Sequence, residues 1–489
     1  MNKSAQLLKD KVVAGGFCIG CGACAIGSAV MRIVETDEGL LQAQVGEPVS
    51  SPAPIREEMD LMTICPMSGV GDDETVLAKQ LFGPDLEWNE HIGHHNAIRV
   101  GHVANQKDRE GGSSGGITTW LLGEMLQRNM IDYVAHVIPN QLGGTGLFAF
   151  GISSSDADLA RGRKSTYYPV EMSSILQTIR NTPGRYAITA VPCFSKALRL
   201  LMQQDPVLND RIVFVVGTVC GHLKSRFFGE YLAWNQGVKP DQLQAIDFRT
   251  KIPGRSANEY AFTPNRDYTK AALNKSVFAA NWEVSLFRYD ACEFCDDVFA
   301  ETADIVMGDA WIMPYQQDWR GNNIIVSRRA ELSAVLEEGR VSGAIVLSNA
   351  SIEDVVHSQV GGLRHRREGL AVRLAHLDQE GKWRPRKRVE ASFTQVDDAR
   401  KELYLRRTQL SRRSIETFRF ARSVGSLTVF KVLISGPVFA YYLRRYGLKR
   451  AIRESAVLKM IRRLLRPNRI PFILHAQNKS ALEGKPLAK

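Results

Sequence analysis

The chain has 489 residues, of which 44% are hydrophobic and 24% are charged. This composition is typical of an ordinary globular protein with room for two to four domains and a large core. The net charge of +11 is unevenly distributed, because residues 361–489 hold 31 Lys and Arg against 10 Asp and Glu, whereas residues 1–360 hold 32 against 42. The basic character therefore belongs to the carboxyl-terminal part.

The first ten residues are polar and charged, without an apolar stretch before the first cysteines. This pattern predicts no secretory signal. Together with cysteines spaced as thiolate ligands, it predicts a protein of the reducing cytoplasm rather than a secreted disulfide scaffold.

Three cysteines at successive two-residue gaps, Cys18, Cys21 and Cys24, are followed far downstream by Cys65-Pro66. Short gaps filled with small residues let one loop wrap an iron–sulfur cubane, and a later Cys-Pro supplies the fourth ligand. The pattern favours a [4Fe-4S] cluster. Structural zinc is the alternative, although zinc ribbons usually come as two separated pairs.

The other four cysteines are Cys193, Cys220, Cys292 and Cys295. Cys193 and Cys220 each follow an apolar, β-branched run, which predicts buried parallel strands at residues 186–191 and 212–216. Both cysteines would then lie at the carboxyl edge of a sheet, where open α/β folds place their sites. Buried structural thiols are the alternative for each cysteine taken singly. Eight cysteines that divide into two sets of four, with none left over, predict two clusters and an electron carrier.

The chain is predicted to divide into an iron–sulfur module at residues 1–75, a body at 76–360 and a basic helical extension at 361–489. A Pro/Ser-rich connector lies at Pro48 to Pro54. His91, His94 and His95 follow in a stretch that we interpret as a solvated linker loop rather than a metal site. Alternating strand-like and helix-like segments from about residue 100 to 350 predict an α/β (α+β) fold for the body.

Four stretches of the body could bind an anionic cofactor. The glycine-rich loop Gly111 to Gly116 precedes a predicted helix, so its amides could hold a phosphate, although a flexible surface loop is an equal alternative. Lys164 to Pro169 and Phe248 to Arg255 offer cations, hydroxyls and aromatic rings, although each alone is typical of a solvated surface. Asp309 follows an apolar strand and could orient a ligand or cap the next helix.

The extension carries the arginine pairs Arg406-Arg407, Arg412-Arg413, Arg444-Arg445 and Arg462-Arg463. They surround an apolar run from Val424 to Leu443 that is about as long as a membrane span but contains Lys431 and a Gly436-Pro437 break. We predict a basic amphipathic region on an anionic membrane surface, with a helical domain packed on the core or on a partner as the alternative. No nucleic-acid recognition motif accompanies the charge, so no nucleic-acid partner is predicted.

Taken in order, these motifs resemble the family of coenzyme F420 hydrogenase/dehydrogenase beta subunits over residues 10 to 350. The motifs are Cys18-x-x-Cys21-Gly22-x-Cys24, Gly112 to Gly116, Ser165 to Pro169, Val191-Pro192-Cys193, Cys220-Gly221-His222, Phe248 to Lys251, Cys292-x-x-Cys295 and Asp304-Ile305-x-x-Gly308-Asp309-x-Trp311. The resemblance implies a small ferredoxin-like iron–sulfur module and a central α/β flavin domain. It also implies FAD beside two [4Fe-4S] clusters.

The resemblance carries residue roles to this chain. Cys193, Cys220, Cys292 and Cys295 match the ligands of the second cluster. The stretches that match the lining of the flavin pocket contain Gly112, Ser113, Ser114, Gly115, Gly116, Lys164, Ser165, Tyr168, Arg249 and Lys251. The implied reaction is a relay, in which a ferredoxin-like donor or partner subunit reduces the first cluster, the second passes electrons inward, and FAD delivers hydride to a small molecule.

This chain departs from the family pattern around its ligands. It has Ala190-Val191-Pro192-Cys193 for Gly-Thr-Pro-Cys, Cys220-Gly221-His222 for Cys-His-Gly, and Gly254-Arg255 for Gly-Trp. The cluster ligands are kept but the pocket is altered, so use of F420 itself does not follow. His222 could act as an acid, and we predict instead that it hydrogen-bonds a cluster sulfur. No catalytic proton donor is assigned.

Three functional classes follow from the sequence. The first is a FAD- and iron–sulfur-dependent oxidoreductase acting on F420 or another small molecule, with a role in surface-polysaccharide metabolism as suspected for bacterial members of the family. The second is a non-catalytic electron-transfer subunit of a larger complex. The third is a zinc-stabilised, membrane-associated structural protein. We favour the first, as a cytoplasmic protein that can lie on the inner face of the membrane.

Overall fold

The computed structural model describes residues 3–47, 59–140 and 146–455. The predicted connector at Pro48 to Pro54 and the pair Arg462-Arg463 lie outside the described residues. The division at residues 75 and 360 stays a proposal.

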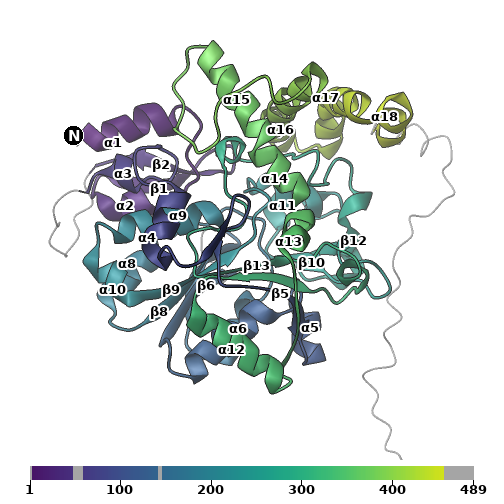
Figure 1. Ribbon diagram of the computed structural model, residues 1–489. Helices are drawn as coiled ribbons and strands as arrows, with labels where there is room; N and C mark the ends of the chain where they lie inside the picture. The colour runs from purple at the N-terminus through teal and green to yellow at the C-terminus, as the bar shows by residue number, and fades with distance from the viewer. Residues whose placement is uncertain (1–2, 48–58, 141–145, 456–489) are drawn as a thin grey trace, which may run out of the picture.

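A mixed eight-stranded sheet forms the centre of the protein (Figure 1). Its order is β15 (Ile345–Asn349), β5 (Ala97–Val103), β14 (Asn323–Ser327), β13 (Ile305–Asp309), β9 (Ile212–Thr218), β8 (Tyr186–Ala190), β6 (Tyr133–Pro139) and β7 (Phe148–Ser153). The four strands β13, β9, β8 and β6 run parallel, and the strands on either side of them pair antiparallel. The α/β class predicted from the alternation of segments is confirmed.

Side chains of the strands alternate between two hydrophobic cores. In β9, Phe214 and Val216 pack with α6 (Ile117–Gln127) and α12 (Ala330–Val341), whereas Val215 faces the opposite core with α9 (Pro192–Met202). This alternation follows from the two-residue period of a strand. Helices cover both faces of the sheet, which explains why the sequences of the parallel strands are continuously apolar.

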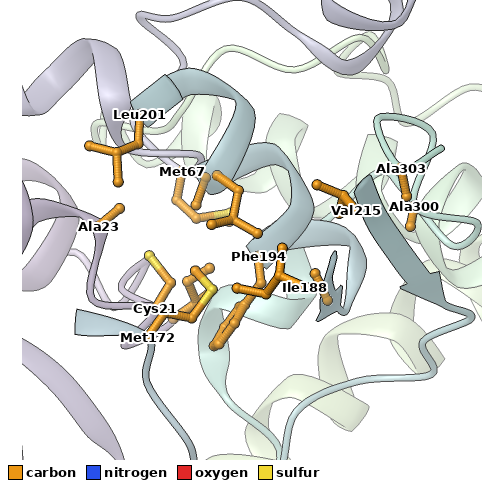
Figure 2. Packing of buried hydrophobic residues seen from close by; sticks show 14 of the residues in the cluster. Cys21, Ala23, Met67, Met172, Ile188, Phe194, Leu201, Val215, Ala300 and Ala303 are labelled. Carbon is orange, nitrogen blue, oxygen red and sulfur yellow. The ribbon is translucent and has the colours of Figure 1, made fainter. Parts of the chain in front are cut away.

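The amino-terminal module packs on the α9 side of the sheet. It consists of α1 (Lys3–Leu7), a π-helical turn at Leu8–Val13, α2 (Ala23–Gly27), the hairpin β1 (Met31–Glu35) and β2 (Leu41–Val45), and α3 (Leu61–Ile64). Figure 2 shows Cys21 and Ala23 of this module in one apolar cluster with Met172, Phe194 and Leu201 of the body. The first cysteine set is thereby fixed against the sheet.

The predicted solvated loop around the three histidines is wrong. Helix α4 (Glu74–Phe82) leads into a hairpin of β3 (Glu87–Asn89) and β4 (Gly93–His95), in which His94 and His95 are buried. The cause is a buried arginine far along the chain, since Arg328 donates to the carbonyl oxygens of His94 at 2.8 Å and Ile92 at 3.0 Å. The hairpin is thus part of the core.

Shorter elements complete the body. The helices are α5 (Gln106–Gly111), α7 (Asp156–Leu159), α8 (Ser173–Asn181), α10 (Pro206–Arg211), α11 (Phe227–Trp234) and α13 (Ile352–Ser358). Helices α14 (Val360–Arg366) and α15 (Glu368–Gln379) belong by sequence to the predicted extension but pack into the core of the body. A small antiparallel sheet contains β10 (Ile246–Thr250), β11 (Ala261–Pro264) and β12 (Ala272–Leu273).

The extension forms helices α16 (Asp398–Ser423), α17 (Leu427–Tyr446) and α18 (Leu448–Glu454), which lie against the body near α11 and α14 (Figure 1). Phe418 and Phe430 stack edge-to-face at 5.2 Å, and Phe430 lies 5.0 Å from Tyr231 of α11. One face of the apolar run packs inside the protein, as the alternative of a packed helical domain predicts, whereas Val432, Leu433 and Leu443 stay exposed on the other face. Contact of the extension with a membrane surface stays a prediction. No helix in the described part of the chain is long and apolar enough to cross a membrane.

Glu230 of α11 is a pH-sensitive contact of this interface. Its carboxylate lies 3.0 Å from Arg422 and 3.5 Å from Arg226, yet burial raises its pKa from about 4.5 to about 7. An acid whose pKa is raised on folding favours the folded state below its unfolded pKa, and this contribution is lost as the pH rises through 7. We expect the free energy of unfolding to fall by about 3 kcal/mol between pH 4.5 and 7.5. Urea titrations of Glu230→Gln should lack this decrease, and an identical decrease in the variant would contradict the assignment.

Candidate functional site

The second cysteine set converges at the carboxyl edge of the parallel strands. Cys220 follows β9, and Cys193 stands in the first turn of α9, directly after β8, where Pro192 opens the helix. Cys292 lies in the short helix Asp290–Phe294 and Cys295 follows it. All four cysteines line one small cavity. The predicted edge position is confirmed for Cys193 and Cys220.

The first set is gathered by two glycines with left-handed backbone. Gly20 and Gly22 have φ values of 66° and 91°, and a Cβ at Gly20 would lie 2.3 Å from the carbonyl oxygen of Leu41. Because only glycine adopts this conformation without strain, the loop can turn between its cysteines. The amides of Gly20 and Ala43 point at the sulfur of Cys18, at 3.4 Å and 3.3 Å.

None of the eight cysteines forms a disulfide, and their environment disfavours isolated thiolates. Burial raises the pKa of Cys220 and Cys65 to about 12 and that of Cys292 to about 11. Within each set the thiols also raise one another's pKa, as Cys21, Cys18 and Cys65 do for Cys24. Deprotonation of a set therefore requires positive charge among its sulfurs, and iron would supply this charge.

An all-thiol set of four matches the ligand requirement of a [4Fe-4S] cluster. In residues 3–47, 59–140 and 146–455, no three His, Cys, Asp or Glu side chains lie close enough to share a single metal ion. A cubane distributes its four ligands over four iron atoms, so that single-ion spacing does not apply to it. The residues present fit two such clusters.

The two cysteine sets are neighbours in the fold. Cys21 of the first set contributes to the raised pKa of Cys193 in the second, and Ile19 of the first loop lines the cavity of the second set. Tyr289 lies between them, where burial raises its pKa and both Cys18 and Cys292 add to the shift. Its hydroxyl accepts the amide of Leu41 at 2.8 Å. The chain thus brings both sets within mutual electrostatic range.

A second cavity, of about 770 Å³, adjoins the second set through Cys220. Its size is that of a small-molecule or cofactor pocket. Eight of the ten residues predicted for the flavin line it: Gly112, Ser113, Ser114, Gly116, Lys164, Ser165, Tyr168 and Arg249. Gly116 has a φ of 85° and directly precedes α6, so the predicted loop-to-helix transition is confirmed.

The other two predicted residues, Gly115 and Lys251, do not line the cavity. A Cβ at Gly115 would lie 2.7 Å from the carbonyl oxygen of Gly101 in β5, so this glycine permits close packing on the sheet. The amine of Lys251 donates to the carbonyl oxygens of Arg109, Ser114 and Arg320, at 2.5, 2.8 and 2.5 Å. Lys251 therefore supports the loop from behind.

The two predicted cations that do line the cavity are already paired. Lys164 lies 3.1 Å from Asp247, and Arg249 forms a two-pronged ion pair with Asp309 at 2.9 and 3.0 Å. Arg249 also donates to the carbonyl oxygen of Ser113 at 3.2 Å, although its Nε has no partner. Asp309 therefore does not cap a helix. It holds the arginine that positions the glycine-rich loop.

The hydrogen bond of His222 to a cluster sulfur stays a prediction. The ring of His222 packs on Trp282 with a centroid separation of 4.5 Å, and its Nε2 is buried without a partner. Burial, followed by the nearby Lys224, lowers its pKa well below the usual value, so the ring is neutral. His222 also lines the cavity.

The extension supplies cavity residues that our sequence interpretation missed. Arg407 and Tyr441 line the cavity, whereas the adjacent Arg406 points outward to Glu402 at 2.6 Å. Successive residues of a helix point about 100° apart, so one arginine of a pair can face inward while its neighbour is solvated. The arginine pairs were visible in the sequence, but their partner surface was not.

Two family models match the chain, and both describe the beta subunit of coenzyme F420 hydrogenase/dehydrogenase. Residues 99–177 match the model of its amino-terminal part, and residues 184–353 match the model of its carboxyl-terminal part. Together the two matches span about half of the chain.

One relative and one solved structure are also similar to this chain. The F(420)H(2) dehydrogenase of Methanosarcina mazei contains a subunit that is 22% identical over 313 residues, which cover 62% of this chain and 79% of the relative. A chain of the F420-reducing [NiFe] hydrogenase complex of Methanosarcina barkeri covers 62% of this chain and 99% of its own length, with 13% identity and a TM-score of 0.47. The chain belongs to the family of coenzyme F420 hydrogenase/dehydrogenase beta subunits, which are electron-transferring oxidoreductases.

Proposed function

We propose that the protein is a FAD-dependent iron–sulfur oxidoreductase that relays electrons between a one-electron carrier and a small hydride-exchanging substrate. The observation that supports this proposal most is the order of the sites: the first cysteine set adjoins the second, and the second adjoins the large cavity through Cys220. Family members typically carry FAD and iron–sulfur clusters.

In this proposal Cys18, Cys21, Cys24 and Cys65 hold one [4Fe-4S] cluster, and Cys193, Cys220, Cys292 and Cys295 hold another. The cavity holds the flavin, with the glycine-rich loop at the amino end of α6 facing its phosphates. A bound flavin supplies the conversion between one-electron and two-electron transfer.

Arg366 fixes the loop that separates the second set from the cavity. It donates to the carbonyl oxygens of Cys220 and Gly221 at 3.0 and 2.7 Å. Burial alone would lower its pKa, but the thiols of Cys295 and Cys220 outweigh this effect and raise it. A fixed cation beside the sulfurs would stabilise added negative charge there.

The electron donor in this proposal is a ferredoxin-like protein or a partner subunit, because the relatives are named as part of a dehydrogenase and as part of a hydrogenase complex. Coenzyme F420 is the first substrate to test. NADP and nucleotide sugars are the next, since the departures Ala190-Val191 and Gly221-His222 line the cavity and a role in surface-polysaccharide metabolism is part of the proposal. Binding of the extension to an anionic membrane surface also stays a prediction.

The test is anoxic flavin reduction by candidate substrates. The full-length protein would be mixed with reduced F420, NADPH and nucleotide sugars while the absorbance at about 450 nm is followed. We expect one of them to reduce the bound flavin, which would be seen as a loss of this absorbance. If none does, but a reduced partner protein does, the chain is a non-catalytic electron-transfer subunit, and the enzymatic part of the proposal is wrong.

A further inference from the structure

The cavity contains a concentration of positive charge that its own carboxylates do not balance. Lys224, Arg366 and Arg407 line it, and none forms an ion pair with a carboxylate among the residues that the structure describes. Lys224 and Arg366 are each 2% exposed. Burying a charge without a counter-charge is costly, so this arrangement indicates an anion that is absent from the protein itself.

The nearby carboxylates are engaged elsewhere. Glu293 is surrounded by Arg288, Arg373 and His365, and it lies 3.1 Å from Arg373 and 3.2 Å from His365. Glu283 accepts from the hydroxyl groups of its tyrosine neighbours and pairs with Arg445 at 3.4 Å. Neither is left to neutralise Arg407.

A cluster bound by the second cysteine set would neutralise only some of these cations. Arg366 lies against the loop of Cys220 and faces the second cysteine set, so a cluster there would balance it. Lys224 lies over the rings of Phe228 and Trp282, at 4.6 and 5.1 Å. An aromatic face attracts a cation but does not neutralise it.

Arg407 is the clearest excess charge. It donates to the hydroxyl oxygen of Ser285 at 3.0 Å, and its Nε is buried without a partner. It adds its charge to a group that already contains Lys224 and Arg288, which line the same cavity. It comes from α16, whereas the family matches end at residue 353, so the extension contributes it.

We propose that Lys224 and Arg407 form an oxyanion subsite in the cavity, built with the extension, that binds a phosphate or carboxylate group of the substrate. Arg288 lies beside them and shares Glu293 with Arg373, so it is only partly neutralised. This inference rests on the proposed function and adds the substrate class, an anionic small molecule. The fork of arginine donors suits planar or tetrahedral oxyanions. The extension thus selects the substrate as well as closing the cavity.

The test compares two adjacent arginines of α16 in the full-length, anoxically purified protein. Calorimetric titration would use inorganic pyrophosphate and citrate as probes of phosphate and carboxylate binding. Arg407→Gln should raise the dissociation constant of the better probe about tenfold or more, because charge-assisted hydrogen bonds are lost. Arg406→Gln, whose wild-type side chain is solvated, should leave the constant unchanged. Arg407→Lys should retain part of the affinity, because it keeps the charge but not the fork of donors.

Flavin and iron contents measured on the same samples distinguish an anion subsite from a flavin-binding or cluster-tuning role of Arg407. Equal weakening in both Gln variants, or no binding to the wild type, would overturn the subsite. Loss of flavin from Arg407→Gln would also overturn it, because the bound anion would then be the flavin's own phosphate. A changed cluster potential with unchanged anion affinity would assign Arg407 to the cluster instead. A wild type without flavin would reject the proposed function, and the contrast between the two arginines would still decide the subsite.

Discussion

Replacing Cys292 by Ser should remove about four of the roughly eight irons per chain and abolish electron transfer to the cavity. Cys292 is one of four thiols around the small cavity next to Cys220, and a serine oxygen is a poor ligand for iron in a site built from thiolates. Iron analysis and the charge-transfer absorbance of the anoxically purified variant would measure the loss. The first cluster should remain, since its ligands lie in the amino-terminal module.

The reciprocal variant is the control for this experiment. Cys21→Ser should also lose about four irons, but from the first site, and the double variant should lose all of them. Additive losses would show two independent sets. An unchanged iron content in Cys292→Ser would reject Cys292 as a ligand, and complete loss in either single variant would show that the two sets do not load separately.

Replacing Asp309 by Asn should lower the free energy of unfolding by about 3–5 kcal/mol, because it leaves the buried guanidinium of Arg249 without its counter-charge. Arg249 is 3% exposed and reaches from Asp309 to the carbonyl oxygen of Ser113. Loss of the pair should therefore also loosen the glycine-rich loop and lower the flavin content. Urea unfolding and flavin analysis would measure the two effects.

A double variant distinguishes unpaired charge from lost packing. Combining Asp309→Asn with Arg249→Met removes both charges and should recover at least half of the stability. Asp132→Asn is the matched surface control, because its partner Arg185 is solvated and exposed pairs contribute little. A loss of stability in Asp132→Asn as large as that in Asp309→Asn would contradict the importance assigned to burial.

The parts of the site that the sequence predicts are those governed by local pattern. β-branched runs before Cys193 and Cys220 predict two parallel strands, and adjacent parallel strands end at one edge, so the convergence of these cysteines follows. The glycine-rich loop is likewise predicted from residues next to one another. In each case the determining contacts lie within one strand, loop or helix.

The parts that the sequence does not predict depend on distant partners. His94 is buried because Arg328 binds its carbonyl oxygen, and the sequence around His94 does not predict that contact. Lys251 has the sequence context of a ligand-binding cation, but it donates to the carbonyl oxygens of Arg109, Ser114 and Arg320 instead. The apolar run of the extension has the composition of a membrane-surface helix, and only the aromatic surface of α11 shows why it packs inward.

The proposed function is tested most directly by the metal and flavin content of the anoxically purified full-length protein. Iron, acid-labile sulfide, zinc and flavin should be measured per polypeptide, together with the absorbance near 450 nm. We expect about eight irons and about one FAD. A colourless protein, or one that contains zinc in place of iron and flavin, would contradict the account.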